Sequence, residues 1–428
     1  MIKLVQSYIP RVKNTIYPMY NNVPRGLSPL YISITFLILT LPNLQAKSIH
    51  HTFILSATIT SFFAITALSH RYKEYHQLIG LVYNFFIIIA FFMIKTKSIV
   101  TFFVYYELFL LPSAGLVWLF SPNIRGKETT KNFILWTQTG SLMLFAAIIF
   151  IRSKIGSTSI YEISELNAAI PTLFKIILLM GFLVKIPTYP FYFWLIKTHV
   201  EAVTSFSIFL SGFLVKIAIY GIYMFLPMMS RPTLLVGLYL AIVSATTASI
   251  IFIHQTDYKK LIAYATVQEM SQLAAAFFIL PRTNITLISI FLITHTLLSI
   301  LYFQKNEALY RIFKVRAIKA MIGSIYIAPK LSIIIATGLL LFRGVPFTTK
   351  NAVEVSLLLN ISELNNYLLF YWAIMIVIFG NVTFSFVNLN ILAFAPTRDM
   401  KPGDVTWTEL LSLTAPMLLL FLTATSFV

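Results

Sequence analysis

Residues 185–221 read KIPTYPFYFWLIKTHVEAVTSFSIFLSGFLVKIAIYG. This stretch is almost wholly apolar, yet Pro187 and Pro190 follow closely on Lys185, and Lys216 stands in the middle of an apolar run. Proline has no backbone N–H to donate and clashes with the preceding helical turn, so we predict that a helix ends near Lys185. Within a bilayer such a break is tolerated only where it is buried in protein or lines a wet cavity. The stretch therefore predicts a helix break and two lysines inside a membrane-embedded bundle.

The composition places the chain among integral membrane proteins. Of its 428 residues 58% are hydrophobic and 11% are charged, and the mean hydropathy is +0.84. A soluble domain has roughly 25% charged residues. With only 11% charged residues, this chain could not cover its apolar surface in water. The chain has no cysteine, which excludes disulfides, thiol chemistry, Cys-ligated zinc and Fe–S centres on this chain.

Apolar runs of about 20 residues recur from end to end, and each is long enough to cross a bilayer as an α-helix. We therefore predict an all-α polytopic membrane protein with about 13 transmembrane helices. The N-terminal residues 1–27 are polar and lack the apolar core and cleavage site of a signal peptide. The predicted spans lie near 28–44, 50–69, 77–95, 98–120, 130–151, 168–188, 203–227, 232–253, 260–280, 283–303, 327–361, 366–394 and 409–427.

The net charge of +18 has two explanations, a nucleic-acid interface or an excess of cations in the loops on one side of a membrane. The Lys and Arg residues lie mostly between apolar runs, and no nucleic-acid-binding signature accompanies them, so we expect no nucleic-acid partner. The N-terminal tail and every second loop carry most of these cations, including the stretch from Lys305 to Lys319. We therefore expect the N-terminus on the side of negative potential, the matrix or cytoplasm, and the C-terminus on the other side.

A second break is predicted in segment 327–361, where Gly344 and Pro346 follow Arg343 and should interrupt the helix near 343–348. In each case the break falls in the fourth helix of a five-helix group, an arrangement typical of transport paths built from repeats. Because five is odd, the second repeat would be inverted. The predicted organisation is a tail with two peripheral helices (1–76), a first repeat (77–227), a second repeat (228–394) and a C-terminal helix (395–428).

Six of the ionisable residues inside the predicted spans stand out, each in a different helix. A charge in hydrocarbon is costly, so such residues face an interior path or a partner by default. One of them alone could be a snorkelling lysine or a core histidine bonded to a carbonyl, but six at similar depth favour a path. Glu, Lys and His are also the side chains that can exchange protons near neutral pH once they are buried. The six are Glu107, Lys185, Lys216, Glu269, His295 and Glu354.

Residues 185–221 resemble the signature of the antiporter-like chain 4 subunits of NADH–quinone oxidoreductase, respiratory complex I. In that family a Lys-x-Pro motif is followed by His-Val-Glu-Ala-Pro and then by Leu-Leu-Lys with a glycine a few residues on. The element His199-Val200-Glu201-Ala202 is specific, because sister subunits of the same fold carry other sequences there. The resemblance covers roughly residues 77–400 and includes Asp257-Tyr258-Lys259-Lys260-Leu261-Ile262-Ala263-Tyr264, His295, and Gly344 and Pro346 with Glu354.

The resemblance implies a role for five of the six ionisable residues. Glu107 matches the essential carboxylate of the family, Lys185 the central lysine of the first channel, and Lys216 the connecting lysine. His295 matches a histidine of the second half, and Glu354 the terminal glutamate in the second broken helix, where it should face the outlet.

Two geometric predictions follow from these roles. A lysine whose pKa depends on a nearby glutamate can be loaded with a proton and unloaded as the distance between the two changes. Lys185 and Glu107 should therefore lie within about 10 Å, the range of a charge in wet surroundings. The other four residues should lie along one polar line near mid-membrane, with the first of them linking to Lys185. These four are Lys216, Glu269, His295 and Glu354.

This sequence departs from the family pattern at several positions. Val203 replaces the family proline, and Glu269 stands where the family usually has a histidine, which puts the usual proton route there in question. Arg343 is an unexpected charge beside the second break, and we expect it to pair with an acidic group or to snorkel into a wet pocket. One N-terminal helix of the family also has no counterpart in the predicted spans.

The resemblance implies a proton-translocating subunit of complex I in the mitochondrial inner membrane. No cofactor is expected on this chain, whereas NADH, FMN, Fe–S clusters and ubiquinone would be bound by partner subunits. The expected partners are other membrane-arm subunits, above all neighbouring antiporter-like chains, and membrane lipids. Two alternatives stay open: a monovalent cation/proton antiporter subunit of the same fold, and a membrane scaffold that conducts nothing. A glutamate at position 354 favours complex I, since the antiporter subunits resemble the sister chains in having lysine there.

Overall fold

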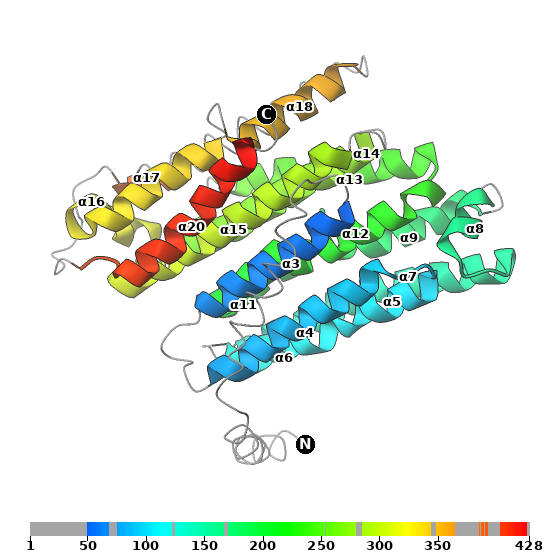
Figure 1. Ribbon diagram of the computed structural model, residues 1–428, viewed down its shortest axis with the longest axis horizontal. Helices are drawn as coiled ribbons and strands as arrows, with labels where there is room; N and C mark the ends of the chain where they lie inside the picture. The colour runs from blue at the N-terminus through cyan, green and yellow to red at the C-terminus, as the bar shows by residue number, and fades with distance from the viewer. Residues whose placement is uncertain are drawn as a thin grey trace, which may run out of the picture.

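The fold is a bundle of long helices that lie roughly side by side (Figure 1). The computed structural model describes residues 49–67, 75–121, 125–166, 170–252, 254–279, 285–343, 348–363, 385, 387–388, 390–392 and 403–425. The predicted span 28–44 and most of 366–394 lie outside these residues. The regular elements of the described part are helices, as the sequence predicts.

The first half of the bundle is made of helices that run from the N-terminal side of the chain to Met228. Within 185–221 the long helices are interrupted by short helices after the prolines and by one π-helix just before Lys216. The elements are α3 (Ile49–Thr66), α4 (His76–Ile94), α5 (Ile99–Leu108), α6 (Leu110–Phe120), α7 (Gly126–Ile155), α8 (Ile160–Glu165), α9 (Thr172–Lys185), α10 (Phe193–Glu201), α11 (Thr204–Phe209), the π-helix η4 (Leu210–Leu214), α12 (Lys216–Phe225) and the 3₁₀-helix η5 (Leu226–Met228).

The second half begins with three long helices, α13, α14 and α15, and continues with shorter helices. Helix α3 packs against α4, α11 and α15, and so joins the two halves (Figure 1). The elements are α13 (Arg231–Phe252), α14 (Tyr258–Ile279), α15 (Ile285–Phe313), the 3₁₀-helix η7 (Ile318–Met321), α16 (Ser324–Ile327), α17 (Pro329–Arg343), α18 (Thr349–Glu363) and α20 (Trp407–Thr425).

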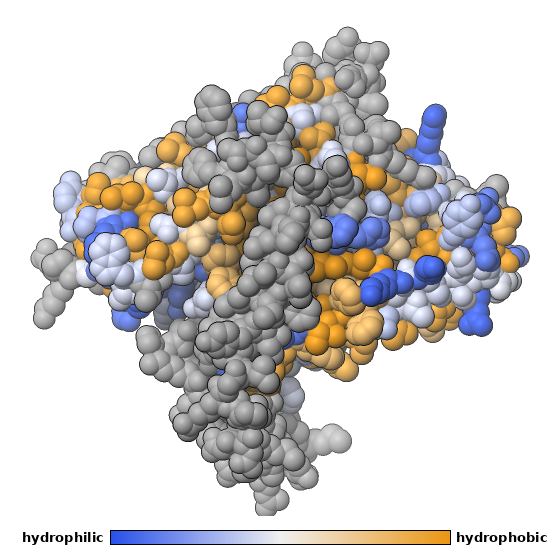
Figure 2. Space-filling view, viewed as in Figure 1, coloured by the Kyte–Doolittle hydropathy of each residue, from blue (hydrophilic) through white to orange (hydrophobic). Residues whose placement is uncertain are grey.

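The surface of the bundle is that of a membrane protein. Seven helical stretches in the described part are long and apolar enough to span a bilayer, and two shorter apolar helices, Pro329–Phe342 and Glu409–Leu420, accompany them. Large apolar side chains such as Leu111 and Tyr239 are about 70% exposed or more (77% and 69%). Figure 2 shows broad hydrophobic areas on the visible face, with many hydrophilic side chains toward the ends of the bundle. The multi-pass prediction is confirmed, whereas the exact number of 13 helices stays a prediction.

One boundary prediction was wrong in an informative way. The predicted span 283–303 continues as α15 to Phe313, so Lys305 is not a loop cation. Its side chain is fully buried, with Nζ 3.0 Å from Asn388 Oδ1 and 4.9 Å from the centre of the Tyr302 ring. These contacts replace water around the ammonium group, and the helix can therefore extend past its apolar stretch.

The first predicted helix break is present, because α9 ends at Lys185 and a new helix begins only at residue 193. Two side chains bind the carbonyls that the break leaves without helical partners. The Thr188 hydroxyl donates to the Leu183 carbonyl at 2.9 Å, and the Trp194 indole N–H donates to the Val184 carbonyl at 3.0 Å. The break is thus satisfied inside the protein, as a break at membrane depth must be.

The second predicted break divides segment 327–361 into two helices. Helix α17 ends at Arg343 and α18 begins at Thr349, with Glu354 on α18. Residues 344–347 and the side chain of Arg343 lie outside the described part, so the predictions for the Arg343 side chain are not tested.

Two loop contacts recur at matched positions in the two halves. Ser98 and Ser159 form an isolated antiparallel bridge in the first half, and Asp257 and Ala317 form the same kind of bridge in the second. Each bridge joins the residue before a long helix (α5 or α14) to the loop that follows the next long helix. Asp257 follows Ser98 by 159 residues and Ala317 follows Ser159 by 158. The internal repeat stays a prediction, and this pairing favours it.

Helices α7 and α9 approach each other through glycine. A Cβ atom at Gly140 would lie 2.9 Å from the Gly181 carbonyl oxygen, and one at Gly181 would lie 2.8 Å from the Gly140 carbonyl oxygen. Small residues allow such close backbone contact between membrane helices. This contact holds α9, and with it Lys185, against α7.

We expect Gly140→Ala to destabilise the protein by about 1–3 kcal/mol, since the added methyl group forces backbone apart. Gly115→Ala is the matched control, because a Cβ atom there meets nothing within 4 Å. The thermal unfolding midpoint of the purified membrane complex should fall for the first variant and stay unchanged for the second. Equal midpoints would show that the α7–α9 contact does not limit stability.

Candidate functional site

The first cluster of the site is the ion pair between Lys185 and Glu107. Lys185 Nζ lies 3.4 Å from Glu107 Oε1, and the Ser141 hydroxyl donates a hydrogen bond to the same oxygen. The ammonium group also lies 3.4 Å from the centre of the Tyr106 ring. The predicted distance limit of about 10 Å is therefore met, with the lysine at the end of α9, the glutamate on α5 and the serine on α7.

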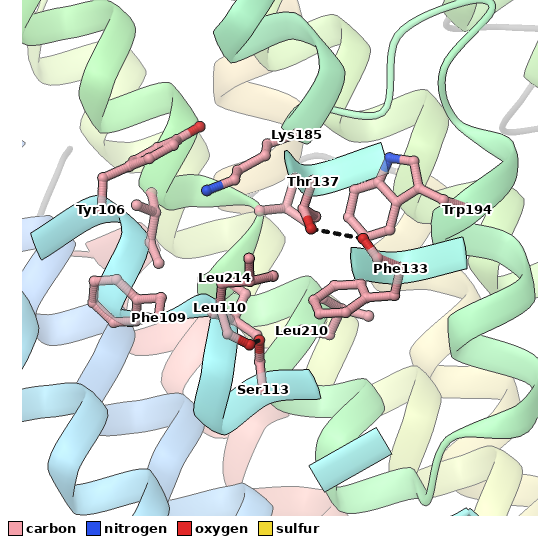
Figure 3. A pocket seen from close by; sticks show the side chains of 12 residues that line it. Tyr106, Phe109, Leu110, Ser113, Phe133, Thr137, Lys185, Trp194, Leu210 and Leu214 are labelled. Atoms are coloured by element: carbon pink, nitrogen blue, oxygen red, sulfur yellow. Dashed lines mark hydrogen bonds between the residues drawn. The ribbon is translucent and has the colours of Figure 1, made fainter. Parts of the chain in front are cut away.

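A small cavity opens beside Lys185 (Figure 3). It offers about 30 Å³ for water centres, and about 10–15 Å³ is enough for one water molecule. The residues that line it include Ser113 and Thr137, and also residues of η4 and the start of α12, with Val215 and Ile217 on either side of Lys216. The cavity thus provides space for water between the first ion pair and the helix that carries Lys216.

Lys216 is the first residue of α12 and is fully buried. Its Nζ donates to the carbonyl of Gly212 at 2.9 Å, within the π-helix that precedes it. The wider π turn arises because Val215 N–H bonds back to Leu210, five residues earlier, at 3.2 Å. Single π turns of this kind occur often at functional sites. Here the irregular turn presents an acceptor to a buried ammonium group.

The second cluster lies on α14, α15 and α18 and is almost wholly buried. Glu269 Oε1 lies 2.9 Å from Lys350 Nζ, and Glu269 Oε2 lies 3.8 Å from His295 Nε2. Lys350 Nζ also lies 3.6 Å from Glu354 Oε1, one helical turn further along α18. Lys216 interacts electrostatically with Glu269 and with His295. The four residues predicted to form a line therefore do belong to one electrostatic group.

The structure separates two explanations for His295. The alternative was a core histidine bonded to a neighbouring carbonyl, but neither ring nitrogen has a hydrogen-bond partner among the described residues. The ring is 1% exposed and its close polar neighbour is the carboxylate of Glu269. Both side chains are turned into the protein, so neither one faces lipid.

Lys350 is the residue that the sequence reasoning missed. It is 5% exposed, and it bridges two of the predicted carboxylates. A signal was available, because Lys350 precedes Glu354 by four residues, the spacing at which side chains meet on a helix. Its second partner, Glu269, lies 81 residues away in the sequence, so only the folded structure shows that pair.

The His-Val-Glu-Ala element is held by cations from the second half. Lys259 Nζ donates to the carbonyl of Ala202 at 2.6 Å, and Arg316 donates to the carbonyl of Val200 at 3.0 Å. The His199 ring stacks on Phe303, with ring centres 4.9 Å apart. These contacts tie the end of α10 to α14 and α15, so they fix the first broken helix relative to the second half.

The described residues contain no group of three or more His, Cys, Asp or Glu side chains that could hold a metal ion. The polar groups of the site are instead spaced for ion pairs and hydrogen bonds. The arrangement suits the transfer of charge or protons between neighbouring side chains and water.

Comparison with known proteins places this geometry in a family. A family model described as NADH:quinone oxidoreductase/Mrp antiporter, TM, matches residues 96–383. NADH-ubiquinone oxidoreductase chain 4 of Paramecium tetraurelia is 31% identical over 352 residues, which are 80% of this chain and 73% of that protein.

Solved structures share the fold at low sequence identity. A chain of the membrane-bound sulfane sulfur reductase, an archaeal respiratory membrane complex, has a TM-score of 0.84 at 15% identity and covers 98% of this chain and 93% of its own. A chain of respiratory complex I from Thermus thermophilus has a TM-score of 0.72 at 16% identity and covers 94% of this chain and 93% of its own. The protein therefore belongs to the NADH:quinone oxidoreductase/Mrp antiporter family of transmembrane subunits.

Proposed function

We propose that this chain is a proton-translocating membrane-arm subunit of mitochondrial NADH:ubiquinone oxidoreductase, respiratory complex I. The observation that carries the proposal is the Lys185–Glu107 ion pair at the end of a broken helix, beside a cavity large enough for water. The family membership and the chain 4 relative support the assignment to complex I. The remaining polar residues continue from this pair toward α18, in the order Lys216, Glu269 with His295, and Glu354.

The ion pair can act as a switch through Coulomb forces alone. Two unit charges about 4 Å apart interact by roughly 4 kcal/mol at the effective dielectric constant near a protein surface. Moving Glu107 away from Lys185 removes that stabilisation, and about 4 kcal/mol corresponds to roughly a thousandfold change in an equilibrium constant. A lysine loaded with a proton while the pair is closed would therefore release it when the pair opens. The Ser141 hydroxyl holds the carboxylate in the closed arrangement.

The released proton would pass through water in the cavity toward Lys216 and then into the second cluster. In this proposal the chain binds no redox cofactor, and NADH oxidation and quinone reduction take place in partner subunits. It works as a translocase component among neighbouring antiporter-like chains in the mitochondrial inner membrane. The energy for opening and closing the pair comes from those partners.

An antiporter subunit of the same fold is the rival explanation, and cation dependence separates the two. A complex I subunit should pump at the same rate in sodium-free and sodium-containing buffer. An antiporter should lose transport when monovalent cations are replaced by an impermeant organic cation. Pumping that depends on sodium would overturn the assignment to complex I.

We expect Lys185→Met to suppress proton pumping and coupled quinone reduction while the complex still assembles. The variant removes the only ammonium group described within 4 Å of Glu107 and leaves an apolar side chain of similar length. Lys197→Met is the matched control, since Lys197 lies in the same stretch but is exposed. NADH-driven pumping into vesicles and the amount of assembled complex should be measured together. Normal pumping by Lys185→Met would contradict the proposal.

The proposed orientation can be tested directly, because the natural sequence contains no cysteine. Lys154→Cys and Thr256→Cys place single thiols at exposed positions near the two matched bridges. Three predicted spans (168–188, 203–227 and 232–253) separate these positions, so they should lie on opposite sides. A membrane-impermeant maleimide should then label Thr256→Cys only from the matrix side and Lys154→Cys only from the other side. Labelling of both thiols from one side would refute the inverted arrangement.

A further inference from the structure

Lys350 lies between two buried carboxylates that come from different helices. Its Nζ is 2.9 Å from Glu269 Oε1 on α14 and 3.6 Å from Glu354 Oε1 on α18. The ring of Phe342, from α17, lies 3.6 Å below the ammonium group. One ammonium group therefore contacts two carboxylates from two helices.

Lys350 and Lys185 both lie beside the helix break of their half, although Lys185 ends the helix before the break and Lys350 lies at the start of the helix after it. Pro346 follows Pro187 by 159 residues, which is the same separation as between the matched loop residues before α5 and α14. Lys185 comes from the broken helix of the first half and pairs with a glutamate of α5. Lys350 comes from the broken helix of the second half and pairs with a glutamate of α14. Each half thus brings a lysine from beside its break to a glutamate on the corresponding helix.

We propose that Lys350 is the proton-carrying lysine of the second half, passing protons from Glu269 to Glu354. The inference rests on the proposed translocation function and adds a residue to it. A neutral Lys350 amine takes the proton of a protonated Glu269 carboxyl, so that an O–H bond breaks and an N–H bond forms. The ammonium then gives a proton to the Glu354 carboxylate, and the neutral amine and a carboxylic acid remain. No other reactant is consumed, and one proton has moved from Glu269 on α14 to Glu354 on α18.

The groups packed around Lys350 fit this role. From α14 it faces Glu269, from α15 it interacts electrostatically with His295, and from its own helix it faces Glu354. Lys216 from α12 acts on the same group through its interactions with Glu269 and His295. A proton that binds near Lys216 or His295 adds positive charge close to Lys350. Because like charges repel in a poorly screened interior, this favours release of a proton from Lys350. Input at one end therefore favours output at the other.

Arginine distinguishes a proton carrier from a fixed ion bridge. Its guanidinium group can hold two carboxylates at once but does not give up its proton under physiological conditions. If Lys350 only neutralises the two glutamates, Lys350→Arg should pump like the natural complex. If Lys350 carries protons, Lys350→Arg should assemble and lose at least about tenfold in pumping rate, because proton transfer by a positioned group is worth two or more orders of magnitude.

The experiment uses the whole complex in sealed vesicles, with NADH oxidation, proton uptake and assembly measured for each variant. Lys350→Met removes the cation and leaves two buried carboxylates, which can impair assembly, so Lys350→Met/Glu269→Gln is included as a variant that removes one charge of each sign. Lys260→Met, at an exposed position on α14, is the matched control and should pump normally. Loss of pumping with retained assembly in Lys350→Arg and in the double variant supports the proposal.

Two outcomes overturn the proposal in different ways. Normal pumping by Lys350→Arg or by the double variant would show that Lys350 is a fixed ion bridge or is not needed. If Lys185→Met still loses pumping in that case, the proposed function remains intact. Normal pumping by Lys185→Met as well as Lys350→Arg removes the proposed function itself. The two failures are therefore distinguishable in the same set of vesicles.

Discussion

The structure depends on one constraint. A charged side chain inside the bundle, or a backbone N–H or C=O without a helical hydrogen bond, must find a partner within the protein. A buried ammonium or carboxylate without a partner costs several kcal/mol or more. At the first break, Thr188 and Trp194 bind the carbonyls that the helix leaves open. In the second cluster, Lys350 holds Glu269 and Glu354 together. Helix breaks and charges can therefore stay at membrane depth, and both are what a proton path needs.

The same constraint explains how much of the site could be predicted from sequence. An intramembrane Glu or Lys is conspicuous among apolar residues, so Glu107 and Lys185 could be singled out before any geometry was known, and the family resemblance implied that they form a pair. The proline after Lys185 likewise located the first break to within a few residues. These predictions succeed because the penalty for an unpartnered charge or a broken helix is large and local in the sequence.

What could not be predicted depends on contacts between distant segments. Lys305 looked like a loop cation because it follows an apolar run, but Asn388 and Tyr302 make its burial possible. Lys350 was not predicted to belong to the site, because its partner Glu269 lies 81 residues away in sequence. The π turn before Lys216 has no signature in residue type. For Lys305 and Lys350 the deciding partner lies more than 80 residues away in the sequence, and the local pattern carries no record of it.

The pairing of Glu269 with Lys350 also accounts for the departure of this sequence from the family resemblance. A glutamate in place of the usual histidine at position 269 adds a negative charge to a buried cluster that already contains Glu354. Left alone, that charge would be repelled by the second carboxylate and poorly solvated. Lys350 balances it at 2.9 Å and links it to Glu354 at 3.6 Å. The change therefore need not interrupt the route through the second half, because the group that compensates the charge is itself able to carry a proton along it.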